Sequence, residues 1–172
     1  AVVGSGFGGG VAALRHAQAG RSVAVLEQGR RISADDMRSG ASSLRRLMWA
    51  PEAGLSGYFR QTVLRHVVVV HGVGVGGGSL VYAAVLLRPK PEAWTAPGWT
   101  GTGVDRHYAE ASTRLGVETN PYVGAQDRWL EQAATDLGVP GSYAPTPQGI
   151  SFDACVRCGA CLSGCVHGAK NS

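Results

Sequence analysis

The sequence contains no apolar run that approaches the length of a membrane span, no internal repeat and no low-complexity tract. A transmembrane helix needs about 20 consecutive apolar residues, so the sequence predicts no such helix. Charged residues make up only 16% of the chain, and its basic residues are not interleaved with aromatic ones. This pattern argues against a nucleic-acid-binding surface.

The composition is that of a globular protein. The chain has 172 residues, of which 44% are hydrophobic, enough for one domain with a core. Its net charge of +4 indicates at most a mild attraction to anionic cofactors or lipids. Residue 1 already lies inside a strand pattern, and Gly168–Ser172 resembles neither a helix end nor a tail. We therefore expect an N-terminal piece of a longer protein.

A first glycine turn follows an apolar strand at Val2–Val3. Gly4 allows the tight turn, Gly6 lets the backbone approach a pyrophosphate, and Gly9 lets a helix pack closely on the strand. The helix expected over about Gly9–Ala19 directs its unpaired N–H groups toward that pyrophosphate. The pattern predicts a dinucleotide site, with a flexible glycine-rich linker as the alternative.

A second buried parallel strand is expected at Ser22–Leu26, after Gly20 ends the helix. Glu27 stands at its carboxyl end, where an acidic side chain accepts hydrogen bonds from a ribose 2′-OH. Glu27 would repel a 2′-phosphate, which disfavours NADP despite Arg30 and Arg31. The motif alone leaves FAD and NAD open.

The middle of the chain is expected to begin with a polar surface loop over Arg30–Ser43, with a short helix around Ser42–Trp49. Tyr58–Val63 and Arg65–Val70 follow as strands. The second strand is nearly all β-branched and is therefore predicted to be buried.

A second glycine-dense turn occupies residues 71–82. Its glycines remove side chains where a flat or charged ligand must lie against backbone, so we expect it to contact the cofactor. Ser79 in this turn either donates to a phosphate or caps the next helix.

Beyond a proline-rich break at Arg88–Pro91, the pattern predicts a loop over Trp94–Gly103 and helices over Asp105–Leu115 and Gln126–Leu137, with Asp105 as a cap. The second helix carries an apolar stripe that we expect to pack in the core. This stripe consists of Trp129, Leu130, Ala133 and Leu137.

All four cysteines have the spacing C-x2-C-x2-C-x3-C: Cys155, Cys158, Cys161 and Cys165. This spacing is typical of a bacterial iron–sulfur run, although Val166 replaces the usual proline. The first three are the natural ligands of a single cluster. The fourth ligand would be Cys165 in an altered geometry or another residue, or the cluster would have no fourth ligand. Zinc is a second metal hypothesis. Reduced thiols in a tight turn, or disulfides, are the metal-free alternatives.

These motifs together resemble the glucose–methanol–choline (GMC) family of flavoprotein oxidoreductases, in particular its cholesterol-oxidase-like bacterial branch. The resemblance rests on Val3–Gly9 with Leu26–Gly29, on Gly74–Val81, and on Cys158–Cys165 with Gly168–Ser172. Tyr82 and Val73 depart from the family, which often has asparagine and arginine at these positions.

The resemblance implies an α/β fold: a Rossmann-like FAD-binding domain with a parallel sheet and helices, incomplete here, plus the start of a substrate or cap region. The expected segments are 1–88 for FAD binding, 89–150 for the helical cap region and 151–172 for the cysteine-rich part. FAD would be bound by Gly4, Ser5, Gly6, Phe7, Gly8, Gly9, Glu27, Gln28, Gly74, Gly76, Gly77, Gly78, Ser79 and Tyr82.

The resemblance also implies oxidation of an alcohol, typically a sterol or similar lipid, with hydride transfer to the flavin. Oxygen or another acceptor would reoxidise the flavin, and a lipid substrate would suit peripheral membrane contact. The family's catalytic histidine lies in a C-terminal region that has no match here, so we expect no catalytic residue in this chain. Alone, it is expected to be inactive and only marginally stable.

Two other functions stay open at this point. The first is an NAD-dependent dehydrogenase that uses the same fingerprint. The second is an electron-transfer module in which an iron–sulfur cluster serves a partner, and a real cluster would favour a dehydrogenase over an oxidase. Reduced cysteines favour a cytoplasmic location.

Overall fold

The computed structural model describes residues 1–95 and 103–170, and the chain divides into two compact units. The first unit contains residues 1–83 and 156–170, and the second contains residues 84–155. Neither described range contains a helix that combines the length and hydropathy needed to cross a bilayer.

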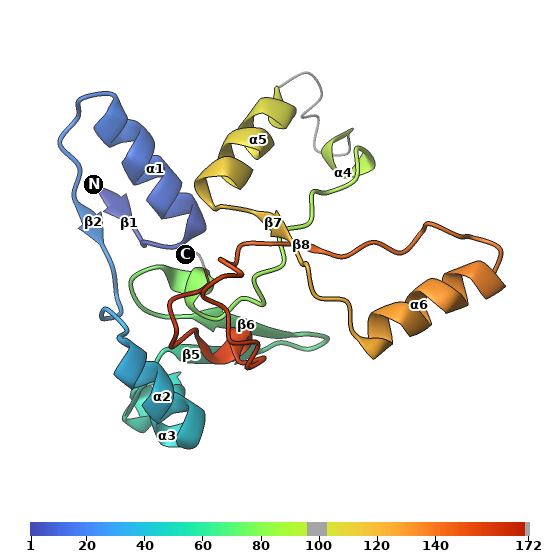
Figure 1. The fold of residues 1–172 in the computed structure, drawn as a ribbon. Coiled ribbons are helices and arrows are strands. Elements are labelled where there is room, and N and C mark those ends of the chain that lie inside the picture. Colours follow the sequence, from blue (N-terminus) through green and yellow to red (C-terminus); the bar gives the residue numbers. More distant parts are fainter. Residues whose placement is uncertain (96–102, 171–172) are drawn as a thin grey trace. The chain divides into compact units, whose positions relative to one another are not determined.

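The first unit begins with a strand, a helix and a parallel strand (Figure 1). Strand β1 (Val2–Val3) pairs in parallel with β2 (Val25–Leu26), and helix α1 (Phe7–Gln18) connects them. This order confirms the predicted strand–turn–helix–strand sequence. The helix begins before the predicted Gly9, because Gly6 in extended conformation is the N-cap residue.

The prediction that the second strand is buried is wrong. Val25 is 43% exposed and Leu26 is 60% exposed. A parallel strand is buried only when neighbouring strands and helices cover both faces of its sheet. In the part of the chain that the structure describes, this sheet has two strands, so the parallel sheet expected from the sequence is present only as one pair.

Helix α2 (Ala34–Ser42) replaces the loop predicted over Arg30–Ser43. Ser33 and Asp36 form a capping box that starts this helix. The Ser33 Oγ accepts from the Asp36 N–H at 3.2 Å, and an Asp36 oxygen accepts from the Ser33 N–H at 2.8 Å. The prediction missed this signal because the segment is polar and lacks an apolar stripe.

Helix α3 (Leu44–Leu47) lies inside the predicted short helix and ends sooner. Strand β3 (Trp49–Ala50) then pairs with β4 (Leu55–Ser56) around the 3-10 turn η1 (Pro51–Ala53). The proline fixes the backbone for that turn and prevents the helix from continuing.

Strands β5 (Phe59–Val63) and β6 (Val68–Gly72) confirm that two strands lie here, and they pair as an antiparallel hairpin. The second strand begins later than the predicted Arg65 and ends later than the predicted Val70. The expected burial of the valine run is wrong, because Val68 and Val70 are 52% and 44% exposed. A two-stranded ribbon cannot cover its own faces.

The small core of the first unit is centred on Tyr58, which is fully buried with Leu80 and Val81. Four partly buried apolar residues surround it: Ile32, Met37, Leu47 and Phe59. The core therefore joins the residue before the hairpin to the end of the second glycine turn.

The second unit contains three helices and one strand pair within its described residues. The helices are α4 (Glu92–Thr95), α5 (Val104–Arg114) and α6 (Ala125–Asp136). Strands β7 (Glu118–Thr119) and β8 (Pro147–Gln148) pair in antiparallel fashion. Helices α5 and α6 confirm the two predicted helices to within one residue at each end.

Two details of these helices differ from the prediction. The N-cap of α5 is Gly103 in a left-handed conformation, whereas Asp105 lies in the first turn and forms an ion pair with Arg88. The expected core stripe of α6 is exposed, with Trp129 at 69% and Leu137 at 79%. An apolar stripe becomes core only where another element packs against it.

Most of the predicted loop over Trp94–Gly103 lies outside the described residues, and α4 occupies its first two positions. The division into segments 1–88, 89–150 and 151–172 stays a prediction.

Replacing Ser33 with alanine should lower the free energy of unfolding by about 1 kcal/mol, because α2 loses its N-cap acceptor. Urea unfolding followed by circular dichroism measures this change. Ser42→Ala is the matched control, since the Ser42 hydroxyl donates only within its own helix. Equal stability of the two variants would contradict the capping role.

Candidate functional site

The two glycine turns lie in direct contact in the first unit. The Gly76 N–H donates to the Ser5 Oγ at 3.0 Å. A Cβ on Gly77 would lie 2.9 Å from the Gly6 Cα, so a side chain at Gly77 would collide with the first turn. Residues about 70 positions apart therefore form one continuous backbone surface.

Glu27 joins this surface through three hydrogen bonds. One carboxylate oxygen accepts from the Ser5 N–H at 2.9 Å and from the Ser5 hydroxyl at 2.7 Å. The other accepts from the Gly29 N–H at 3.0 Å. A carboxylate offers about four lone-pair positions, so about one is left for a ligand hydroxyl.

The electrostatics of Glu27 favour its ionised form. Burial raises the pKa of this carboxyl, but the hydrogen bonds from Gly29 and Ser5 lower it by more, and the net pKa lies below the ordinary value. Glu27 is thus an anionic acceptor, fixed in position by Ser5.

Close packing requires glycine at several positions of the site. A Cβ on Gly9 would lie 1.9 Å from the Gly4 oxygen, and one on Gly29 would lie 2.4 Å from the Gly74 nitrogen. Around Gly8, in contrast, no atom lies within 4 Å of the Cβ position. The backbone is therefore packed on one side of the first turn and open on another.

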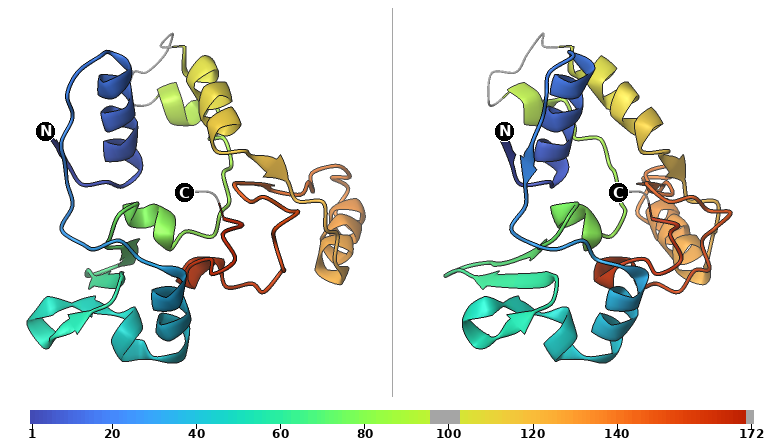
Figure 2. Two further views of the ribbon diagram at one scale, coloured as in Figure 1. Left: turned by 60° about the vertical axis from the view of Figure 1, so that its left-hand side comes forward. Right: turned by 90° about the vertical axis from the view of Figure 1, so that its left-hand side faces the viewer.

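The N-terminus of α1 completes the site. Its N-cap, Gly6, provides no side-chain hydrogen bond, and the first turn contains no acidic residue. Unpaired N–H groups and the positive end of the helix dipole favour an anion there. In both views of Figure 2 this end of α1 lies beside the 3-10 turn η2 (Gly77–Leu80).

The second turn depends on left-handed glycines: φ is +145° at Gly74, +105° at Gly76 and +56° at Gly77. Ser79 is 4% exposed, and its hydroxyl donates to the Gly76 oxygen at 3.0 Å. Ser79 thus stabilises the turn from inside, and the N-cap of η2 is Gly76.

Aromatic side chains link the ends of the two turns. The Phe7 and Tyr82 rings meet edge to face, with centroids 5.6 Å apart. Gln28, in contrast, has an exposed side chain. The structure thus gathers the predicted cofactor residues around the two turns, and their binding of a cofactor stays a prediction.

Lys170 is a site residue that the sequence reasoning missed. It is only 8% exposed, and its ammonium group donates to three main-chain oxygens: Leu80 at 2.8 Å, Cys161 at 2.8 Å and Tyr82 at 3.2 Å. The ammonium also lies 5.0 Å from the centre of the Tyr82 ring. Burial lowers the pKa of Lys170. No sequence pattern indicates this burial, because the contacts span 88 and 90 residues.

The cysteine-bearing segment is held against the first unit at other points as well. The buried Tyr58 hydroxyl donates to the Ser163 oxygen at 2.5 Å. Gly164 has φ of +107°, and a Cβ there would lie 2.7 Å from the Met37 sulfur. Figure 2 shows the 3-10 turn η3 (Cys161–Ser163) beside α2 in both views.

The structure gives no support to the iron–sulfur hypothesis. Cys155, Cys158, Cys161 and Cys165 are free thiols. Within residues 1–95 and 103–170, no three His, Cys, Asp or Glu side chains converge to hold a metal ion. A cluster or a structural zinc requires converging thiolates. The glycines at positions 159 and 164 instead allow left-handed turns between the cysteines.

Comparisons with known proteins agree on one family. Residues 8–172 match the sequence model of the GMC oxidoreductases. A cholesterol oxidase from Acinetobacter baumannii is 36% identical over an alignment of 199 positions. The alignment covers 99% of this chain and 36% of that protein. A cholesterol oxidase from Mycobacterium tuberculosis is 37% identical over an alignment of 202 positions, which covers 99% of this chain and 35% of that protein.

A long-chain-alcohol oxidase from Arabidopsis thaliana is more distant, with 33% identity over 178 residues, which cover 99% of this chain and 23% of the relative. The chain thus spans about a third of the length of the cholesterol oxidases that it matches.

Replacing Gly9 with alanine should lower the free energy of unfolding by about 1–3 kcal/mol, because the new methyl group collides with the Gly4 carbonyl. Gly8→Ala is the matched control and should change stability by less than about 1 kcal/mol, since its methyl group enters open space. Chemical unfolding measures both. A Gly9→Ala variant as stable as Gly8→Ala would refute the packing.

Replacing Lys170 with methionine should destabilise the protein by about 1–3 kcal/mol, because buried carbonyl oxygens lose their donor. The exposed Lys90→Met is the control for the loss of one positive charge. Thermal unfolding of the two variants gives the comparison. If the two variants unfold at the same temperature, Lys170 does not stabilise the turn.

Proposed function

The chain belongs to the GMC oxidoreductase family, and on this basis we propose that it binds FAD and forms the cofactor-binding part of an alcohol-oxidising flavoprotein. The observation that carries the proposal is the contact between the two glycine turns through Ser5 and Gly76. One extended dinucleotide can touch both turns only if they are adjacent.

The residues present fit a dinucleotide. The open backbone at Gly4 and Gly8, together with the N–H groups at the start of α1, suits the pyrophosphate. The remaining acceptor position of Glu27 suits a ribose hydroxyl. The second turn presents bare backbone for the flavin end. We propose that the parallel pair β1–β2 is the start of a Rossmann-like domain.

FAD, when bound, supplies the acceptor for the hydride of the alcohol. The residues of this chain would bind and orient it. Ser5 fixes the Glu27 carboxylate relative to the second turn, and Lys170 holds the end of that turn. We assign no proton-transfer residue in this chain.

The substrate that we propose is a lipid-like alcohol, such as a sterol or a long-chain alcohol. The relatives that support this substrate class are named cholesterol oxidase and long-chain-alcohol oxidase. Oxygen as electron acceptor rests on the same names, because both relatives are oxidases.

The experiment compares FAD binding by the full-length protein and its Ser5→Ala variant. The wild-type protein should purify with the visible absorbance of bound flavin. The variant loses the acceptor of the Gly76 N–H and one donor to Glu27, so its affinity for FAD should fall about tenfold. Titration of the apoprotein with FAD, followed by flavin fluorescence, measures this change.

Ser42→Ala serves as the control, because its hydroxyl lies on an exposed helix surface outside the site. A protein that binds NAD and no flavin would overturn the proposal. An unchanged FAD affinity in Ser5→Ala would remove Ser5 from the site.

A further inference from the structure

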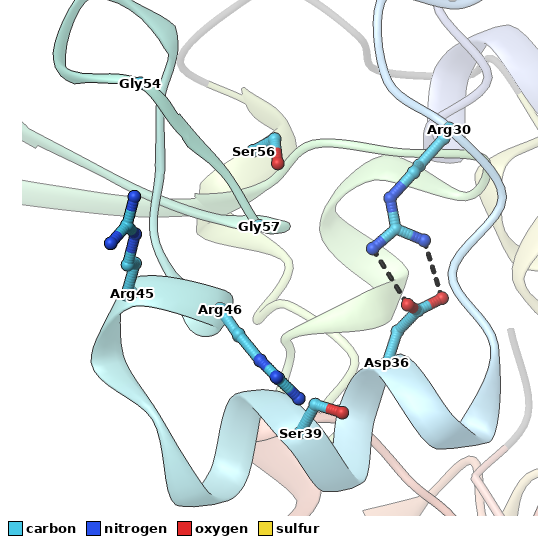
Figure 3. Close-up of a pocket in the computed structure, with 8 residues that line it drawn as sticks. All are labelled: Arg30, Asp36, Ser39, Arg45, Arg46, Gly54, Ser56 and Gly57. Atoms are coloured by element: carbon cyan, nitrogen blue, oxygen red, sulfur yellow. Dashed lines mark hydrogen bonds and ion pairs between the residues drawn. The ribbon is translucent and has the colours of Figure 1, made fainter.

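A polar cavity of about 620 Å³ lies in the first unit (Figure 3). Helices α2 and α3 and the segment at β4 form its walls. Its lining residues are Arg30, Asp36, Ser39, Arg45, Arg46, Gly54, Ser56 and Gly57.

The charge of this cavity is positive. Arg30 and Asp36 neutralise each other through two hydrogen bonds of 2.6 and 2.9 Å. The guanidinium of Arg30 holds the pKa of the Asp36 carboxyl far below its usual range, with help from Ser33, so this pair stays formed near neutral pH. The guanidinium groups of Arg45 and Arg46 form no ion pair or hydrogen bond within the described residues, which leaves two uncompensated positive charges.

The two uncompensated arginines flank the cavity. Figure 3 shows Arg46 extended from α3 toward Ser39 on α2, whereas the Arg45 side chain points in another direction, away from Ser39. The Ser56 hydroxyl, which has no partner in the described part of the chain, lies on the same wall as Gly57. Each of these groups offers N–H or O–H donors, which suit an oxyanion.

The lining excludes the alcohol of the proposed reaction. No lining residue has a large apolar side chain, whereas a steroid or a long alkyl chain needs an apolar pocket. The residues of the two glycine turns are also absent from the lining. The lining of this cavity therefore differs from the backbone surface proposed for the cofactor and does not suit an apolar substrate.

We propose that this cavity binds the phosphate group of an organic phosphate. A guanidinium donates two parallel hydrogen bonds to phosphate oxygens, and arginine clusters are a recurring phosphate-binding device. The cavity is large enough for a ligand of ordinary size, so the phosphate is one part of a larger molecule. That molecule is a soluble phosphate ester or the headgroup of a phospholipid.

The test uses the FAD-loaded full-length protein and two kinds of probe. Glycerol 3-phosphate, measured by isothermal titration calorimetry, represents the soluble ester. Phosphatidylcholine vesicles with and without phosphatidic acid, measured by co-sedimentation, represent the lipid headgroup. The double variant Arg45→Gln/Arg46→Gln should weaken binding of the effective probe at least tenfold. Binding of glycerol 3-phosphate identifies the soluble source, and binding of phosphatidic acid vesicles alone identifies the lipid.

The matched control is Arg65→Gln/Arg106→Gln, which removes the same net charge from exposed positions outside the cavity. It should bind the probes as the wild-type protein does. The proposal is overturned if neither probe binds the wild-type protein, or if the two double variants lose affinity equally. The visible flavin spectrum reports the cofactor separately, so a failure of FAD binding and a failure of phosphate binding are distinguishable.

Discussion

The hydroxyl group of Ser5 is the interaction on which the arrangement of the first unit depends. It donates to Glu27 and accepts from the backbone of Gly76, and so it fixes three loops relative to one another. Each loop alone is a glycine-rich segment with high conformational entropy. Their mutual hydrogen bonds and the absence of side chains between them convert them into one preorganised surface. Preorganisation lowers the entropy that a bound dinucleotide would otherwise have to overcome.

Much of this surface could be predicted from the sequence, because its determinants are local. The spacing of Gly4, Gly6 and Gly9 specifies a turn between a strand and a helix. Glu27 directly follows the apolar run that predicts the next strand. The two longest helices of the second unit were also predictable from their periodicity and glycine stops. Helix α2 was missed, although its capping box was present in the sequence.

The remaining features could not be predicted, because they depend on contacts between distant segments. The burial of Lys170 requires carbonyl oxygens from both the second turn and the cysteine segment. The valines of β6 and the stripe of α6 have the composition of core residues, yet they are exposed. Hydrophobic pattern predicts which face of an element can be buried. Whether something packs on that face is a property of the assembled structure.

The position of Lys170 along the chain also has a consequence for biosynthesis. The carbonyl groups of Leu80 and Tyr82 leave the ribosome roughly 90 residues before the ammonium group that binds them. At translation rates of about 5–20 residues per second, this interval lasts several seconds. During that time the nascent second turn lacks its permanent donor. The second turn can therefore reach its final structure only after the segment that follows the cysteines has been synthesised.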